Sequence, residues 1–207
     1  MRTYGTKPWP AQLKEYITKR AKIRRAVERE RNLTRIPLKL PSGKTVTISP
    51  GGQNPLIKLI IEEFCPRFAP GSTVVYIGDA ESKFLHLEAA YLEGLGVVVA
   101  PAAKMPDVVV HDAKRNWLVL IEAVTSAGVV DWKRRNELKE LFRGWKVGLV
   151  FVTAFESRGA MQSFLPQISW ETEVWIAEDP EHLIHFDGER FLVPYPDVMP
   201  EIGFQKP

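Results

Sequence analysis

The chain has 207 residues, of which 45% are hydrophobic and 26% charged, and its formal net charge is +3. These proportions are typical of a folded globular protein and exclude disorder over most of the length. No apolar run reaches the roughly 18 residues that span a bilayer, and the first residues lack the apolar stretch of a signal peptide, which favours a cytoplasmic protein with no membrane partner. A single cysteine, Cys65, excludes an internal disulfide and a cysteine-rich zinc site, so any metal must be held by oxygen or histidine.

Residues 10–35 differ from the rest of the chain in charge. They hold nine Lys or Arg side chains against three Glu, a net charge of +6, whereas the remaining residues are net −3. The apolar side chains of this segment recur at helical spacing: Leu13, Tyr16, Ile17, Ile23 and Val27. The sequence therefore predicts a basic amphipathic helix. Such a helix suits a DNA backbone, an anionic membrane surface or an acidic partner, and a merely solvated helix face is an equally good interpretation.

The segment that follows predicts a β-hairpin and then a helix. Residues 35–49 contain two short alternating runs on either side of the turn sequence Pro-Ser-Gly at 41–43. Residues 54–64 are predicted to be a helix, with Asn54 as its cap and Pro55 in its first turn. A regular order of strands and helices begins after this helix.

The rest of the chain predicts an α/β fold. In chain order the expected elements are a strand at 73–78, a helix at 81–96, strands at 97–100, 106–112 and 116–124, a helix at 131–142, a strand at 146–155, a short helix near 157–165, a strand at 172–177, and a small hairpin with an extended tail over 185–200. The strands at 106–112, 116–124 and 146–155 are almost continuously apolar, as strands buried on both faces are. We therefore expect a mixed β-sheet flanked by helices on both sides.

Two carboxylates interrupt these apolar strands. Asp107 follows Pro106 at the start of one strand, and Glu122 lies near the end of the next. An unpaired buried carboxylate is costly unless it is protonated, paired or bound to a metal. If the two strands are neighbours, both acids converge at one end of the sheet and offer the hard oxygen ligands that Mg²⁺ requires. The alternative is structural: Asp107 caps a turn, and Glu122 pairs with a nearby Lys or Arg.

Four sequence blocks carry a more specific signal. They are GDAESKFLHLE at 78–88, KMPDVV at 104–109, NWLVLIEAVTS at 116–126 and KRRNEL at 133–138. In this order they resemble the catalytic domain of the BsuBI/PstI type II restriction endonucleases, which has the restriction-endonuclease-like core. The resemblance implies a Mg²⁺-dependent endonuclease that hydrolyses phosphodiester bonds in double-stranded DNA. We expect a basic helical arm at 1–35 and a catalytic domain at 36–207.

The resemblance also implies roles for particular residues. Asp107 and Glu122 become the metal ligands, and the backbone carbonyl of Ala123 faces the same ion. Glu88, on the preceding helix, is either a further catalytic carboxylate or a solvated one. Related nucleases carry a lysine two positions after the strand glutamate, and this chain has Val124 there.

If the chemistry is retained, the missing lysine must come from elsewhere in the chain. Lys104 is the first choice because it is closest in sequence to a proposed ligand, and Lys83 and Lys133 are alternatives. This chain also has Ala102-Ala103 and Ala127-Gly128-Val129 where the family pattern places polar residues. A loss of activity is therefore an open alternative.

The expected partner is double-stranded DNA. We assign its backbone contacts to basic side chains of the arm and of helix 131–142: Lys19, Arg20, Arg24, Lys133 and Arg134. Because a duplex has two strands of opposite polarity, we expect a homodimer on DNA with one site in each subunit. The four histidines show no ligand pattern, and we interpret them as structural or surface groups.

Two other classes of function remain open. The buried strand that ends in Gly78-Asp79 is compatible with a nucleotide or S-adenosylmethionine site at its carboxyl end, although a single glycine is weak support. A nuclease fold without its lysine could also serve as a DNA-binding module with no catalytic activity. Metal-dependent cleavage, melting that responds to S-adenosylmethionine, and salt-sensitive binding without cleavage would distinguish the three classes.

Overall fold

A mixed sheet organises this molecule, for which we describe a computed structural model. The structure describes residues 9–79, 84–97, 99–100, 103–126, 128–143 and 147–186, with the backbone alone over 26–33. Within these ranges the main sheet has seven strands in the order β4, β3, β5, β6, β7, β8, β9. A separate two-stranded sheet pairs β1 with β2.

The central strands of the main sheet lie next to the two acids: Asp107 directly precedes β5, and Glu122 lies in β6. The bounds are β3 Thr73–Ile77, β4 His86–Leu87, β5 Val108–Asp112, β6 Trp117–Val124, β7 Gly148–Phe155, β8 Glu173–Ile176 and β9 Leu183–His185. β5 pairs antiparallel with both β3 and β6, whereas β6 with β7 and β7 with β8 are parallel pairs. The edge strands β4 and β9 are antiparallel to their neighbours. The expected mixed sheet is confirmed, and the strands that flank the two acids are neighbours.

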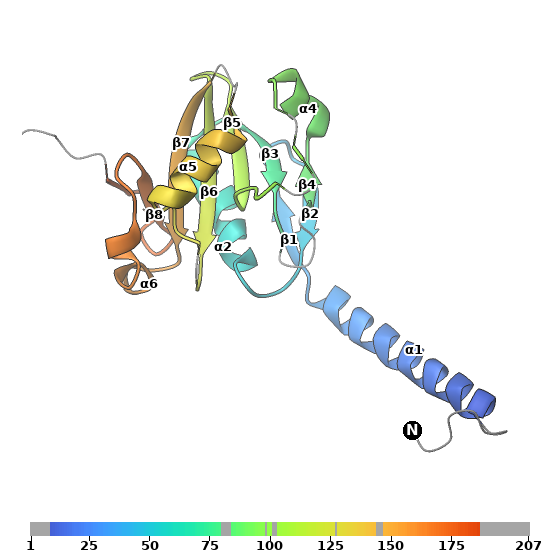
Figure 1. The fold of residues 1–207 in the computed structure, drawn as a ribbon. Helices are drawn as coiled ribbons and strands as arrows, with labels where there is room; N and C mark the ends of the chain where they lie inside the picture. Colours follow the sequence, from blue (N-terminus) through green and yellow to red (C-terminus); the bar gives the residue numbers. More distant parts are fainter. Residues whose placement is uncertain are drawn as a thin grey trace, which may run out of the picture.

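Helices cover both faces of this sheet (Figure 1). The first group consists of the hairpin β1 (Ile36–Lys39) and β2 (Thr45–Ile48), and of α2 (Asn54–Leu59), the π-helix η1 (Ile60–Phe64) and α3 (Cys65–Phe68). The second group consists of α4 (Ala89–Gly94) and α5 (Trp132–Leu141), and α6 (Arg158–Gln162) with a 3₁₀ turn (Leu165–Gln167) follows β7. In Figure 1, α5 crosses one face of the sheet and α2 lies behind it.

Each face has its own apolar core. Ile57 and Ile61 of the first group lie in one buried cluster with Ile121 of β6. Leu138 of α5 lies in a second cluster with Leu120, the neighbouring residue of the same strand. Because successive side chains of a strand point to opposite faces, β6 is buried on both sides. Its continuous apolar run follows from this position.

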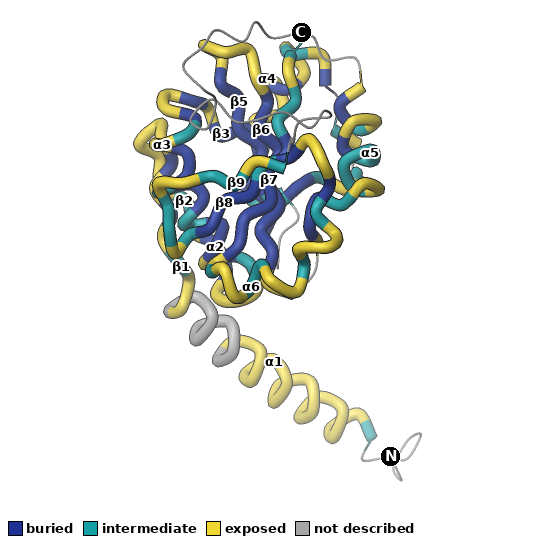
Figure 2. Tube along the Cα trace, turned by 90° about the vertical axis from the view of Figure 1, so that its left-hand side faces the viewer, coloured by how far each residue is buried: buried dark blue, intermediate teal, exposed yellow. Residues whose placement is uncertain are grey.

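The first helix, α1 (Trp9–Leu33), leaves the body of the molecule (Figures 1 and 2). The predicted helix is confirmed, but the apolar side chains that recur along it at helical spacing are exposed where the structure describes them. Tyr16, Ile17 and Ile23 are 55–57% exposed. The guanidinium of Arg20 lies over the ring of Tyr16, 5.3 Å from its centre. Among the described helices, this one included, none is long and apolar enough to cross a membrane.

The predictions for residues 81–100 are wrong in part. Residues 86–87 form the edge strand β4, with Leu87 opposite Tyr76, so the helix is shortened to Ala89–Gly94. His86 is buried, and its Nε2 lies 3.0 Å from the carbonyl oxygen of Val74. Cross-strand pairing with β3 therefore overrides the helical spacing of the sequence. The expected strand at 97–100 is absent from its described residues 97, 99 and 100.

The sequence predicted Asn54 as the cap of its helix, and this prediction is wrong. Gln53 occupies the capping position, and Asn54 is the first helical residue. Asn54 is fully buried, and its Nδ2 donates to the carbonyl oxygen of Ser49 at 2.9 Å and to its Oγ at 2.8 Å. The side chain ties the start of the helix to the end of β2. A long-range partner of this kind cannot be read from local sequence.

Candidate active site

The pairing of β5 with β6 brings the two acids together. Val108 lies opposite Ile121 in this antiparallel pair. One further step along the same register places Asp107 opposite Glu122. Glu122 alternates with Ile121 and Ala123, which pack in the first core, so its side chain points to the face that carries α5. The sequence prediction that both acids meet at one end of the sheet is supported by this register.

Both oxygens of Asp107 accept hydrogen bonds. Oδ2 accepts from the backbone N–H of Ala123 at 2.8 Å, and Oδ1 accepts from Nε2 of Gln53 at 3.2 Å. Burial raises the pKa of Asp107, and the hydrogen bonds from Ala123 and Gln53 oppose the rise. An extended residue directs its N–H and its carbonyl to the same side, so the carbonyl of Ala123 also lies toward Asp107.

Glu122 is 7% exposed and is bonded to Arg134. Nε and Nη2 of Arg134 both lie 2.7 Å from Oε1 of Glu122. Burial raises the pKa of Glu122 to about 8, with the charge of Arg134 opposing the rise and the charge of Asp107 adding to it. Burial and the same two acids raise the pKa of Tyr76 to about 12. The charge of Arg134 and the ionisation of Asp107, Glu122 and Tyr76 therefore influence one another.

Hydrogen bonds from both the backbone and the side chain hold Arg134 in place. Its backbone N–H donates at 2.6 Å to Oδ1 of Asp131, the N-cap of α5. Its Nη2 donates at 3.1 Å to the carbonyl oxygen of Met105, two residues before Asp107. The guanidinium thus links Glu122 on β6 with the segment that leads into β5.

A hollow of about 250 Å³ opens beside this arginine. Its lining includes three basic side chains, Lys104, Lys133 and Arg134, and two acidic ones, Asp131 and Glu137. Lys104 is exposed, and the side chain of Lys133 is 78% exposed, with its Nζ 3.9 Å from Glu137. The hollow therefore has three basic and two acidic side chains in its lining, a small excess of positive charge on the α5 side of the sheet.

A known protein family matches most of this chain. The model of the BsuBI/PstI restriction endonuclease domain matches residues 36–189. The chain belongs to the BsuBI/PstI restriction endonuclease family. The family resemblance carried by the four sequence blocks is thereby confirmed.

Three proteins illustrate the extent of the likeness. Type II restriction enzyme BsuBI of Bacillus subtilis is 46% identical over 195 residues, which cover 94% of this chain and 62% of that protein. Type II restriction enzyme AplI of Arthrospira platensis is 31% identical over 195 residues, covering 91% of this chain and 60% of AplI. The structure of SdaI restriction endonuclease matches with a TM-score of 0.74 and 46% identity, over 94% of this chain and 61% of SdaI. The chain thus spans about three fifths of the length of these relatives.

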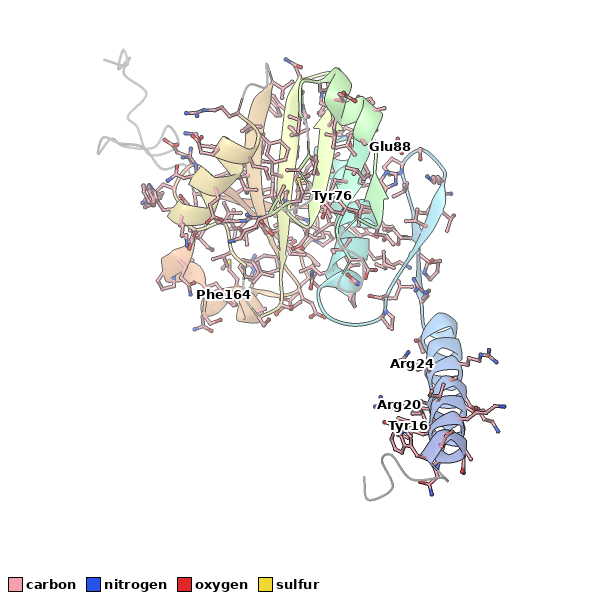
Figure 3. The ribbon with its side chains drawn as sticks, turned by 45° about the vertical axis from the view of Figure 1, so that its right-hand side comes forward. Tyr16, Arg20, Arg24, Tyr76, Glu88 and Phe164 are labelled. Atoms are coloured by element: carbon pink, nitrogen blue, oxygen red, sulfur yellow. The ribbon has the colours of Figure 1, made fainter. Side chains whose placement is uncertain are left out.

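Glu88, predicted as a further carboxylate of the BsuBI/PstI site, has its contacts elsewhere. Its Oε1 lies 3.5 Å from Nε2 of His86, and its side chain is 47% exposed. It lines a different hollow, together with Lys44 of the hairpin and Thr73 of β3. Figure 3 shows Glu88 at the edge of the body and Tyr76 within it. These contacts do not bring Glu88 to Asp107 and Glu122, and its catalytic role stays a prediction.

The remaining predicted residues are divided between the body and the arm. Val124 is 1% exposed and packs in an apolar cluster with Phe155. Lys83 lies outside the described residues. Lys19, Arg20 and Arg24 are exposed on α1, where Figure 3 labels the two arginines, and their role in DNA binding stays a prediction.

The histidines lie where structural and surface groups are expected. His86 is buried at β4, and Nδ1 of His111 lies 2.8 Å from the hydroxyl of Tyr91. His182 and His185 are exposed and contact Asp179 and Glu173 respectively. None of these contacts involves Asp107 or Glu122.

Sequence reasoning missed a polar network beside Asp107. Ser49 donates from its N–H and its Oγ to the two oxygens of Asp79, at 2.6 and 2.7 Å. Asn54 donates to Ser49, and the adjacent Gln53 reaches Asp107. The Gly-Asp turn that suggested a nucleotide site therefore anchors the segment that carries Gln53. The only indication of this network in the sequence is the pair of polar residues Gln53 and Asn54 after Gly51-Gly52, and their partners are distant in sequence.

The donor set fits Mg²⁺. No group of three or more His, Cys, Asp and Glu side chains suited to a metal occurs among the residues that the structure describes. Asp107 and Glu122 together offer two carboxylates, and Mg²⁺ is usually held by one or two carboxylates together with water and substrate phosphate. The carboxylate oxygens of Asp107 each keep acceptor capacity after their hydrogen bonds from Gln53 and Ala123.

Proposed function

We propose that this chain is a metal-dependent endonuclease that hydrolyses phosphodiester bonds in double-stranded DNA, with Asp107 and Glu122 as the ligands of Mg²⁺. The single observation that supports it most is the β5–β6 register, which, continued by one residue, sets Asp107 opposite the buried Glu122. The names of BsuBI and AplI, type II restriction enzymes, support the same class of activity.

The protein's own residues would prepare this site before DNA arrives. Gln53 and the N–H of Ala123 fix the orientation of Asp107, and Arg134 fixes that of Glu122. When bound, Mg²⁺ would supply charge for the phosphate and lower the pKa of a water molecule. Of the lysines that the sequence offers for the missing one, Lys104 is exposed in the lining of the hollow beside Arg134, where we propose that it attracts the DNA backbone. Lys133 is positioned to attract the DNA backbone.

Plasmid cleavage tests this function directly. We expect the protein to cut supercoiled plasmid in Mg²⁺ and to lose at least about 10³-fold in rate as Asp107→Ala or Glu122→Gln, because each change removes several kcal/mol of metal-dependent stabilisation. Glu140→Gln serves as the matched control, since Glu140 is 65% exposed on α5 and pairs with Arg143.

The same experiment tests the alternative of a DNA-binding module without activity. Binding to duplex DNA with no cleavage in either Mg²⁺ or Mn²⁺ would favour that alternative. An Asp107→Ala protein that melts well below the parent but still cuts would assign this acid to the fold.

The proposed homodimer on DNA is tested by sizing the protein with and without a palindromic duplex. Two copies on one duplex, with linear plasmid as the product, would support a symmetric dimer that cuts both strands. A single copy on the duplex, with nicked circles as the stable product, would contradict it.

A further inference from the structure

We propose that Arg134 is the active-site cation of this nuclease, contacting the scissile phosphate in place of the lysine that Val124 has displaced. This inference rests on the proposed nuclease function and adds a catalytic residue to it. It replaces an exposed DNA-backbone contact, the role that the sequence suggested for Arg134, with a role at the reacting group.

The strand itself cannot supply a cation beside Glu122. Val124 points to the same face of β6 as Glu122, because the two are separated by one residue. Its side chain is 1% exposed and packs with Phe155 and Ile176. An ammonium group in this apolar cluster would be costly to bury.

Arg134 brings a cation to Glu122 from α5, the helix that covers this face of the sheet. Two of its nitrogens lie 2.7 Å from Oε1 of Glu122, and Nη2 also donates to the carbonyl oxygen of Met105. The guanidinium therefore touches the strand that carries one acid and the segment that precedes the other. A planar guanidinium offers five N–H donors and suits carboxylate and phosphate groups alike.

The position of this guanidinium is fixed by the packing of α5. Asp131 caps the helix through the N–H of Arg134, and Leu138 buries the next turn of the helix against the sheet. The Arg134 side chain is 17% exposed, against 78% for the adjacent Lys133. Arg134 is thus held at the acids, whereas Lys133 extends toward solvent.

The accessible side of Arg134 faces the hollow beside it, where its Nη1 lies 3.5 Å from Oε2 of Glu137. Lys104 and Lys133 line this hollow with it, so a phosphate that enters meets Arg134 next to Glu122. In the hydrolysis, the water oxygen bonds to phosphorus, the bond from phosphorus to the leaving oxygen breaks, and the water proton ends on the leaving oxygen. Arg134 keeps its own protons throughout and donates hydrogen bonds to the phosphate, where negative charge develops.

The test compares Arg134→Ala, Arg134→Lys and the control Arg143→Ala. Arg143 follows α5, is 78% exposed and pairs with Glu140 at 3.3 Å, which makes it a solvated counterpart of the same residue type. Single-turnover cleavage in Mg²⁺ at saturating DNA gives the rate, and DNA affinity in Ca²⁺ gives the binding. The rise in Tm on adding Mn²⁺ without DNA reports the metal site.

We expect Arg134→Ala to lower the rate about 100- to 1000-fold, the loss typical of a positioned donor to developing charge. Its DNA affinity should change by less than about threefold, because the other basic side chains still bind the DNA backbone. Free guanidinium should restore part of the rate, Arg134→Lys should be intermediate, and Arg143→Ala should match the parent.

Three results would overturn the inference while leaving the nuclease function intact. The first is an Arg134→Ala protein that cuts at the rate of the parent. The second is an Arg134→Ala protein whose Tm no longer rises with Mn²⁺. The third is that free guanidinium changes the Tm of Arg134→Ala but not its cleavage rate. The first result means that Arg134 has no role in the reaction, and the other two assign it to the metal site or the fold. A parent that neither cuts DNA nor gains Tm in Mn²⁺ would instead overturn the proposed function and this inference with it.

Discussion

Arginines occupy two contrasting environments in this molecule. Arg20 and Arg24 are exposed on α1, which projects from the body, whereas Arg134 is mostly buried and bonded to Glu122. Exposed charges act through solvent and are screened over a Debye length of about 8 Å at physiological ionic strength. A buried charge instead acts through fixed contacts. We therefore expect the basic residues of α1 and Arg134 to have different roles.

The largest expected effect comes from the pH dependence of stability that the buried Glu122 causes. The pKa of Glu122 is raised from 4.5 to about 8, so the folded protein holds a proton that the unfolded chain has lost between these values. Its contribution to stability is therefore greatest below about pH 4.5 and is lost as the pH rises toward 8, by an amount on the order of several kcal/mol.

Calorimetry without divalent metal, from pH 5 to 8, tests this sign. Glu122→Gln cannot ionise, so its Tm should rise relative to that of the parent as the pH increases. Parallel curves for the two proteins would show that Glu122 titrates normally.

The next largest effect is expected at Gln53, which fixes Oδ1 of Asp107. Groups that orient a metal ligand are typically worth about 10- to 100-fold in metal affinity. We expect a loss of this size in the Mn²⁺ affinity of Gln53→Ala, measured by titration calorimetry. Gln12→Ala, in the exposed helix α1, is the control, and equal affinities of the two variants would remove Gln53 from the site.

The smallest effect is expected in the arm, and it should depend on salt. Replacing Lys19, Arg20 and Arg24 by Ala should flatten the log–log dependence of DNA affinity on salt by about 0.9 for each phosphate that the arm no longer neutralises. The weakening should be the same for all duplex sequences, because binding to the DNA backbone carries no sequence information. An unchanged slope would assign α1 to another partner.

The elements around the acids could be predicted because their signals are local. The apolar runs on either side of a short turn predicted β5 and β6, and an acid inside each apolar segment marked Asp107 and Glu122. Residues 86–87 could not be assigned in this way, because a two-residue edge strand depends on β3. Because His86 belongs to that strand, Glu88 contacts His86 and lies elsewhere than the predicted helix would place it.

The missed parts of the site depend on contacts distant in sequence. Gln53 is 54 residues from Asp107, and its position follows from the bonds among Asn54, Ser49 and Asp79. The sequence KRRNEL predicted a basic helix but not its rotation, so Arg134 resembled a surface residue. The packing of Leu138 in the second core fixes that rotation.

The most direct test of the proposed metal site is a crystal structure of the protein with Mn²⁺ in place of Mg²⁺, using anomalous scattering to locate the metal. We predict an anomalous peak between the two acids, with carboxylate oxygens of both Asp107 and Glu122 at about 2.0–2.2 Å, near the distance typical of Mg²⁺. A peak at other residues, or none between these acids at saturating Mn²⁺, would contradict the assignment of both acids as metal ligands.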